Sequence, residues 1–506
     1  MLKNIPVVAL LLMLFTTTVM AQNSTTADKD LDGIPDAWET AGYVNITMPD
    51  GSKQKLDLTR DGPLSPDHQD IFVWIAWMED SSHTHRPSPK AMQYIKDAFA
   101  AAPRERFNPD GKKGIRLHIY YSANPLPEKT VLGSVDAMDN YDWSDFRMLM
   151  NSTFPKDLMG KFHFCIFAHN IPQGRTGIAD ISGYNLIVSL GDVGPNGVGV
   201  TEDQAGTFMH ELGHNLGLLH GGIENTPLYK PNYISVMNYL FQLGGIQKNG
   251  APSWDYSEFS LEADERALLK EKGLNASPDL AIYGTQYYCG TKMDWQSVDS
   301  ITDPIDWDCS GSMTGSAHED INHDGEVGIL HGANDWENVR LIFTSNNPAA
   351  GVVPKQRLKI SDELDAKMAN TLSLPRITHI QASLGPGGVR LWWPRIDLDR
   401  MIAYTVRRQN SNAALTEIGA TKDNTFLDRN VPRGSNSYYV SGVFLPYGSS
   451  RTSPALSYII DPASPAFEKM DGIGVLGTKR VQRTSAASQT LVRETTISFP
   501  VTIEIR

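Results

Sequence analysis

The chain has 506 residues, of which 41% are hydrophobic and 20% are charged, and its formal net charge is -13. This length exceeds what one hydrophobic core ordinarily supports, so we expect two or three domains. The acidic balance argues against a general nucleic-acid binder, because binding to phosphates requires clustered Lys and Arg side chains. The negative charge is compatible with bound calcium, which would neutralise part of it.

The N-terminal residues have the order of a secretory signal peptide. Lys3 precedes an apolar stretch from Val7 to Phe15, and small residues at 19 and 21 end it. We therefore expect residues 1–21 to be a signal peptide cleaved after Ala21, and the mature protein to be extracellular or periplasmic. No other stretch approaches about 18 uninterrupted apolar residues, so no membrane span is expected.

The chain contains three cysteines. Cys289 and Cys309 flank a polar loop, and in an exported protein such a pair is expected to form a disulfide. Cys165 lies in the apolar run 162–167, where a buried thiol that acts as a small hydrophobic side chain is expected.

An acidic loop lies in the N-terminal segment 22–69. From position 28, carboxylates occupy positions 1, 3, 5, 9 and 12 of a 12-residue loop, and Gly33 occupies position 6, where a sharp bend is needed. This pattern predicts a calcium site, and a solvated acidic turn is the alternative. The segment resembles the calcium repeats of bacterial secreted proteins and the thrombospondin type 3 repeat. The predicted ligands are Asp28, Asp30, Asp32, Asp36 and Glu39.

Residues 70–190 alternate strand-like and helix-like patterns, which indicates a mixed twisted sheet backed by helices. We expect this sheet to belong to an α+β domain that covers residues 70–345. The expected strands are 71–77, 115–121, 162–167 and 186–190, and the expected helices include 89–102 and one beginning near 201.

The C-terminal part differs in character. Residues 346–376 are expected to be a linker, and residues 377–460 contain several short alternating strands between Gly, Pro and Asn turns, which indicates an all-β sandwich. The segment 377–460 resembles a fibronectin type III domain. Residues 461–506 form a tail that we do not assign to a module.

The run from position 210 to position 220 has the spacing of a catalytic zinc site. His210 and His214 are four residues apart on the expected helix, so both imidazoles project from one face, and Glu211 lies beside them. Gly217 lets the chain turn so that His220 can return as a third ligand. Three protein ligands leave a position open for water. A surface helix with solvated histidines is the alternative.

This run resembles the extended zinc signature of the metzincin metallopeptidases, and residues 235–239 resemble their Met-turn. The resemblance implies that Met237 forms an apolar floor under the three imidazoles. The Ser-x-Met-x-Tyr form is similar to the astacin and serralysin branches, which implies that Tyr239 is a fifth zinc ligand or an oxyanion stabiliser; a plain structural role is the alternative. Gly221 departs from the residue that typifies the best-known branches, so the branch is left open.

These residues predict a secreted zinc endopeptidase. Zinc would acidify a bound water, and Glu211 would act as general base. The resemblance implies that an edge strand above the helix holds an extended substrate, and residues 177–180 are the candidate for that strand. We expect protein or peptide substrates, glycoproteins among them, and a monomeric protein. One alternative is a non-catalytic adhesion or glycan-binding protein on the same scaffold, against which the intact Glu211 argues. Another is a peptidase restricted to glycoproteins.

A second acidic loop begins at position 320. Oxygen-bearing side chains fill positions 1, 3 and 5, Gly325 fills position 6, and position 12 is His331, with Asp335 nearby. This loop could bind calcium or be a solvated turn. The expected cofactors of the chain are therefore one catalytic zinc ion and one or two structural calcium ions. The predicted ligands are Asp320, Asn322 and Asp324.

Overall fold

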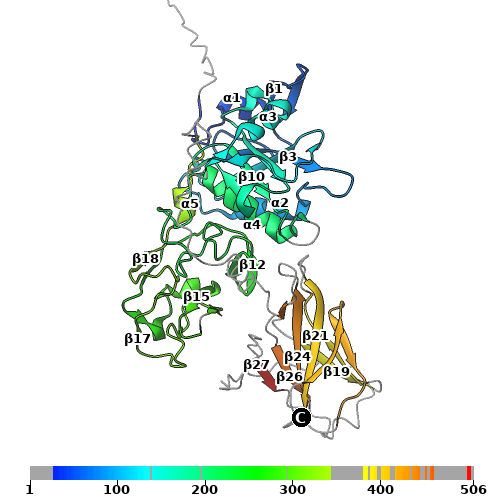
Figure 1. Cartoon of the computed structure of the whole chain (residues 1–506), viewed down its shortest axis with the longest axis vertical. Coiled ribbons are helices and arrows are strands. Elements are labelled where there is room, and N and C mark those ends of the chain that lie inside the picture. Colours follow the sequence, from blue (N-terminus) through cyan, green and yellow to red (C-terminus); the bar gives the residue numbers. More distant parts are fainter. Residues whose placement is uncertain are drawn as a thin grey trace, which may run out of the picture.

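The computed structural model describes residues 27–136, 140–193, 197–292, 294–343, 380–385, 388–395, 401–410, 416–432, 436–444, 451–452, 456–460 and 499–502. The expected signal peptide (1–21), the expected linker (346–376) and most of the C-terminal tail lie outside the described residues. In the described part the regular structure is mostly sheet, with few helices (Figure 1). None of the described helices is long and apolar enough to cross a membrane.

A mixed sheet lies at the centre of the first half of the chain. Its strand order is β4-β3-β8-β10-β9, and β5 extends it by pairing with β3. Strand β9 is the antiparallel edge strand, and the other pairs are parallel. The strands of this sheet are β3 Asp70–Glu79, β4 Arg116–Tyr121, β5 Leu126–Pro127, β8 His163–Ala168, β9 Gly177–Ala179 and β10 Asn185–Ser189.

Both faces of the sheet are covered, which explains why β3 reads as one continuous apolar run. Its odd-numbered residues, such as Val73, face a core that includes α2 and α4, and its even-numbered residues, such as Trp74, face a core that includes α3. Figure 1 shows α3 on one side of β3 and β10, and α2 and α4 on the other. The helices are α1 Asp36–Ala41, α2 Pro89–Ala101, α3 Ser144–Thr153, α4 Thr201–Asn215 and α5 Asp335–Asn338.

Helix α2 follows ordinary helix chemistry. The Ser88 hydroxyl caps it by accepting from the backbone N–H of Ala91, and Pro89 occupies the first turn. Its apolar residues Met92, Ile95 and Phe99 recur at helical spacing and are buried toward the sheet.

Short two-stranded sheets and loops make up most of the remaining region before position 343. A separate apolar cluster fills the part from Tyr229 to Leu330, and the disulfide Cys289–Cys309 lies there. Cys165 is a buried free thiol in β8. The pairs are β1 Tyr43–Thr47 with β2 Lys53–Asp57, β6 Ser134–Val135 with β7 Tyr141–Asp142, β11 Ile246–Lys248 with β12 Ala251–Ser253, β13 Glu262–Asp264 with β18 Ile329–His331, β14 Leu268–Leu269 with β17 Ser316–Ala317, and β15 Thr285–Cys289 with β16 Asp294–Val298. Short 3-10 turns are Lys156–Leu158, Pro172–Gly174, Lys270–Lys272 and Pro278–Ile282.

The described residues from 380 onward form strands in two further sheets. A core that includes Trp393, Tyr404 and Tyr438 is shared between them. Strand β27 from the expected tail pairs in parallel with β26, so this part of the tail belongs to the sheet. The sheets are β19 Gln381–Gly385, β20 Gly388–Trp392 and β23 Thr425–Asp428, and β21 Met401–Asn410, β22 Thr416–Thr421, β24 Asn436–Phe444, β25 Arg451–Thr452, β26 Leu456–Ile460 and β27; β27 covers Phe499–Thr502.

Candidate metal centre

Helix α4 carries two of the three predicted zinc ligands. Every residue of α4 is buried, so His210 and His214 are not solvated on a surface helix. His210 donates from Nδ1 to the Val236 carbonyl oxygen at 2.8 Å, and His214 donates from Nδ1 to the Leu218 carbonyl oxygen at 2.9 Å. These hydrogen bonds fix the ring orientations and leave the Nε2 lone pairs for a ligand.

The chain after α4 returns the third histidine to the first two. Gly217 has a φ of +88°, in the left-handed region that glycine tolerates best, so the chain can turn back directly after the helix. Nε2 of His220 then lies 2.9 Å from Nε2 of His214. Ring nitrogens of all three histidines lie within 4.8 Å of one another, which is the convergence that one metal ion requires.

Burial keeps these imidazoles neutral in the metal-free protein. Desolvation lowers the pKa of His210 to about 3 and the pKa of His214 to about 4, and it lowers the pKa of His220 well below its usual value. The neutral imidazole is the form that binds a metal ion, so no proton has to be displaced at neutral pH.

Glu211 is buried beside the histidines. Its Oε2 has no hydrogen-bond partner among the described residues, and burial raises the pKa of this carboxyl well above its usual value. The neighbouring edge strand β9 passes close to the carboxylate, because a Cβ on Gly177 would lie 2.5 Å from Oε1 of Glu211. An unpaired buried carboxylate oxygen is costly unless it serves a ligand or a reaction.

The turn that contains Met237 lies directly against α4. A Cβ on Gly213 would lie 2.3 Å from the sulfur of Met237, so this helix position has no room for a larger residue. The hydroxyl of Tyr239 lies 3.1 Å from Nε2 of His220. The structure therefore brings Tyr239 to His220, and it brings Met237 to the turn of α4 that lies between His210 and His214.

Asp335 holds this turn in place. The sequence had placed Asp335 near the second acidic loop instead. Its carboxylate is buried and accepts hydrogen bonds from the hydroxyls of Tyr233 and Ser235. The Ser235 oxygen in turn accepts from the backbone N–H of Met237 at 3.1 Å. Asp335 therefore belongs to the support of the Met237 turn and not to the second acidic loop.

The first acidic loop gathers carboxylates, most of which are buried. Asp28, Asp30 and Asp32 form one group and Asp32, Glu39 and Asp70 another, each with carboxylate oxygens within 4.8 Å of one another. Asp30 and Glu39 are only 2% and 3% exposed, and none of their four carboxylate oxygens has a hydrogen-bond partner among the described residues. Ionising buried carboxylates that have no hydrogen-bond partner is costly, and a bound cation would offset that cost.

Two residues of this cluster differ from the prediction. Asp36 is absent from these groups, and its Oδ1 accepts from the backbone N–H of Lys29 at 2.9 Å. Asp70, the first residue of β3, joins the cluster instead, and its backbone N–H donates to Asp32 at 2.7 Å. No signal in a 12-residue loop pattern points to a residue 38 positions downstream of Asp32.

The second acidic loop is held by its own hydrogen bonds. Asp320 accepts from the backbone N–H groups of Asp324 and Gly325, and the Asn322 amide donates to Asp324. Within the part of the chain that the structure describes, Asp320 and Asp324 are in no group of converging metal-binding side chains. His331, at position 12, pairs with Glu262.

A third loop with the same backbone geometry went unnoticed in the sequence. Asp306 accepts from the backbone N–H groups of Ser310 and Gly311, as Asp320 and Asp28 do in their own loops. Here the Lys270 ammonium bonds to Asp308 and to the Ser310 hydroxyl. In this loop the Lys270 ammonium therefore lies among the oxygens and supplies the positive charge that a metal ion would otherwise supply.

No protein-family model matches the chain, and no curated protein matches it. Three solved structures show limited similarity. Pectate lyase Pel3 from Pectobacterium carotovorum is 26% identical, with 17% of this chain and 27% of that chain covered and a TM-score of 0.14. The FN1–FN3 domains of chicken CNTN1 are 12% identical, with 43% and 66% covered and a TM-score of 0.15. Catalytically inactive OgpA from Akkermansia muciniphila, in complex with an O-glycopeptide, is 11% identical, with 78% and 93% covered and a TM-score of 0.16.

The match to the pectate lyase spans about a quarter of that protein's length, since it covers 27% of it. TM-scores of 0.14 to 0.16 establish no shared fold with any of the three proteins.

Proposed function

We propose that this protein is a secreted zinc-dependent endopeptidase of the metzincin type, with an α+β catalytic domain. The observation that carries the proposal is the convergence of three buried neutral imidazoles beside a buried carboxylate with an unpaired oxygen. His210, His214 and His220 are the proposed zinc ligands. A zinc ion held by these residues would act as a Lewis acid and would lower the pKa of a coordinated water toward neutrality.

The residues around the histidines have the chemistry that peptide hydrolysis needs. Glu211 would accept a proton from the attacking water and deliver it to the leaving amine, because it is buried next to His210 on α4 and one of its carboxylate oxygens has no hydrogen-bond partner among the described residues. The Tyr239 hydroxyl, beside His220, donates a hydrogen bond to the developing oxyanion.

Strand β9 is suited to holding the substrate. It is the edge of the sheet and pairs with β10 along one side. An extended peptide adds to such an edge through main-chain hydrogen bonds. Because Gly177 lies against Glu211, a peptide on β9 would be held next to the general base.

We also propose a structural calcium ion in the first acidic loop, held by Asp28, Asp30, Asp32, Glu39 and Asp70. The unpaired buried oxygens of Asp30 and Glu39 support it. Calcium takes several carboxylate oxygens and binds only to the folded arrangement, so it would stabilise the protein.

The decisive experiment compares casein digestion by the wild-type chain and by Glu211→Gln. We expect Glu211→Gln to lose activity by a factor on the order of 10²–10⁴ and to retain its zinc. Glu262→Gln, at a side chain that is 70% exposed, is the matched control and should digest casein normally. A wild-type chain that binds zinc but cleaves neither casein nor a mucin would contradict the proposal.

A further inference from the structure

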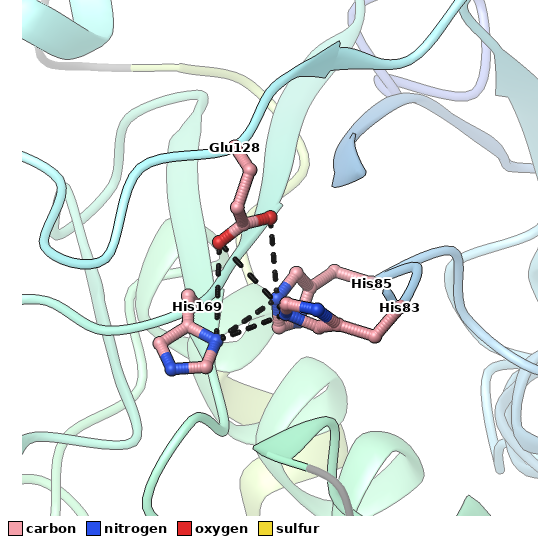
Figure 2. A group of neighbouring side chains, drawn as sticks. All are labelled: His83, His85, Glu128 and His169. Atoms are coloured by element: carbon pink, nitrogen blue, oxygen red, sulfur yellow. Dashed lines mark hydrogen bonds and ion pairs between the residues drawn. The ribbon is translucent and has the colours of Figure 1, made fainter. Parts of the chain in front are cut away.

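A second cluster of metal-binding side chains lies outside the site described above. His83, His85, Glu128 and His169 each offer one ligand atom, and these atoms all lie within 4.8 Å of one another. Figure 2 shows the four side chains pointing toward a common centre. The sequence pattern alone gave no indication of this cluster.

The spacing of the ligand atoms fits a small metal ion with tetrahedral coordination. Nδ1 of His169 lies 3.2 Å from Nε2 of His83 and 3.2 Å from Nε2 of His85. The Glu128 carboxylate oxygens lie 3.5 to 4.0 Å from the three ring nitrogens. Ligands at about 2.0–2.1 Å from a tetrahedral zinc ion are separated from one another by about 3.3–3.4 Å.

The rings are arranged as ligands and not as a stack. Their interplanar angles are 70° to 81°, so each ring presents an edge nitrogen to the centre. Both carboxylate oxygens of Glu128 are buried and make no hydrogen bond among the described residues. A carboxylate surrounded by imidazole nitrogens and lacking hydrogen-bond donors is in a poor environment unless a cation is bound.

His83 also has the outer partner that metal-binding histidines usually have. Its Nδ1 lies 2.8 Å from the Ser82 hydroxyl and 3.2 Å from Oδ1 of Asp80. The Asp80 carboxylate favours the ring proton on Nδ1 and so leaves the Nε2 lone pair facing the cluster. With Glu128, it would also balance the two positive charges of a divalent ion.

The fold brings the four residues together at the carboxyl end of the central sheet. His83 and His85 follow β3, Glu128 follows β5 and His169 follows β8, so all lie at the carboxyl ends of parallel strands. His83 and His85 are two residues apart around a β-bridge at Thr84, which turns both side chains to the same face.

The loop before α4 is fitted around His169. A Cβ on Gly191 would lie 2.7 Å from the His169 ring, and a Cβ on Gly197 would lie 3.0 Å from it. Ser88, three residues after His85, contacts Thr201 at the first turn of α4 at 3.0 Å. The cluster therefore links the strand ends to the start of the helix that carries His210.

We propose that His83, His85, Glu128 and His169 bind a second, structural zinc ion. Three imidazoles and one carboxylate form a ligand set that suits zinc, and four protein ligands make a closed site with no position left for substrate. This site is independent of the proposed peptidase activity.

The test uses the full chain with the first site disabled by His210→Ala and His214→Ala. We expect this protein, after gel filtration, to retain about one zinc equivalent by elemental mass spectrometry. Adding His85→Ala should remove that zinc, whereas adding His331→Ala, at a partly exposed histidine paired with Glu262, should not. Cobalt(II) in place of zinc should give the intense visible absorption of a tetrahedral site, and His85→Ala should abolish it.

Asp80→Asn provides a second test in case His85→Ala does not fold. Asp80 is a partly exposed partner of His83 and not a proposed ligand, so its replacement should leave the fold intact. We expect it to weaken zinc binding by about 10–100-fold in a chelator competition. A folded chain lacking His210 and His214 that holds no zinc would overturn the proposal. So would zinc binding that His85→Ala and Asp80→Asn leave unchanged, or a cobalt spectrum typical of six ligands. Each readout is independent of casein digestion, so a chain without peptidase activity could still bind this zinc.

Discussion

Gly177 on the edge strand and Glu211 on α4 are in such close contact that a single added carbon does not fit between them. A Cβ on Gly177 would lie 2.5 Å from Oε1 of Glu211 and 2.7 Å from the carboxylate carbon. The backbone of β9 thus fixes one side of the space that the Glu211 carboxylate can occupy.

Gly177→Ala is therefore expected to displace Glu211, the proposed general base, without altering any of the three proposed zinc ligands. Misplacement of a catalytic group by about 1 Å can cost about 100-fold in rate, and we expect kcat/KM to fall by about that factor. Zinc content should remain at the wild-type value. Gly328→Ala is the control, since a Cβ there would meet no atom within 4 Å. Full activity of Gly177→Ala would show that Glu211 has room to move.

Gly213→Ala tests the contact between α4 and the Met237 turn. The added methyl would lie 2.3 Å from the Met237 sulfur, so the turn must shift. Although alanine favours helices, we expect a net loss of about 1–3 kcal/mol, which is the usual cost of overpacking a core. Urea unfolding measures it. Increased stability would mean that Met237 can rotate away at no cost.

Tyr239→Phe separates oxyanion stabilisation by the hydroxyl from a plain structural role. If the hydroxyl stabilises the oxyanion, kcat should fall by about 10²–10³-fold while KM changes little. If Tyr239 only packs beside His220, both constants should stay near their wild-type values. Steady-state kinetics on a fluorogenic peptide, with zinc content measured in parallel, distinguish the two outcomes.

The carboxylate cluster predicts that calcium protects the protein more at higher pH. Without calcium, burial raises the pKa of Asp30 to about 7 and the pKa of Glu39 to about 10. The folded state therefore holds protons that the unfolded chain releases near pH 4. The metal-free protein should lose stability as the pH rises from about 4 to about 7 through Asp30, and on to about 10 through Glu39.

Calcium binds the ionised carboxylates and should reverse that loss. Melting temperatures with calcium and with a calcium chelator, at pH 5 and pH 8, give the measurement. The increment from calcium should be larger at pH 8, and Glu39→Gln should reduce it. An equal increment at both pH values would contradict a calcium site at these residues.

Sequence patterns predicted the elements whose residues are close together in the chain. The continuous apolar run 71–77 lies within β3, which is buried on both faces, and the helix expected to begin near 201 is α4, all of whose residues are buried. His210, His214 and His220 also share one short segment, so local geometry was enough to bring them together.

The features that the sequence did not predict depend on long-range topology. His83 and His169 are 86 residues apart and meet because β3 and β8 are adjacent parallel strands. Asp70 reaches the acidic loop because it begins β3, and Asp335 reaches Ser235 across 100 residues. No spacing rule within one segment encodes these contacts.

Strand β3 connects the acidic cluster and the cluster of His83, His85, Glu128 and His169. Asp70 at its start belongs to the carboxylate cluster, and His83 and His85 follow its other end. Any opening of either end would release an ion, and its free-energy cost therefore grows with ion concentration. The amides of β3 should thus be among the slowest in the protein to exchange with deuterium, and chelation should accelerate them more than the amides of the C-terminal sheets. The rate of deuterium exchange in β3 would then depend on the concentration of metal ions around the protein.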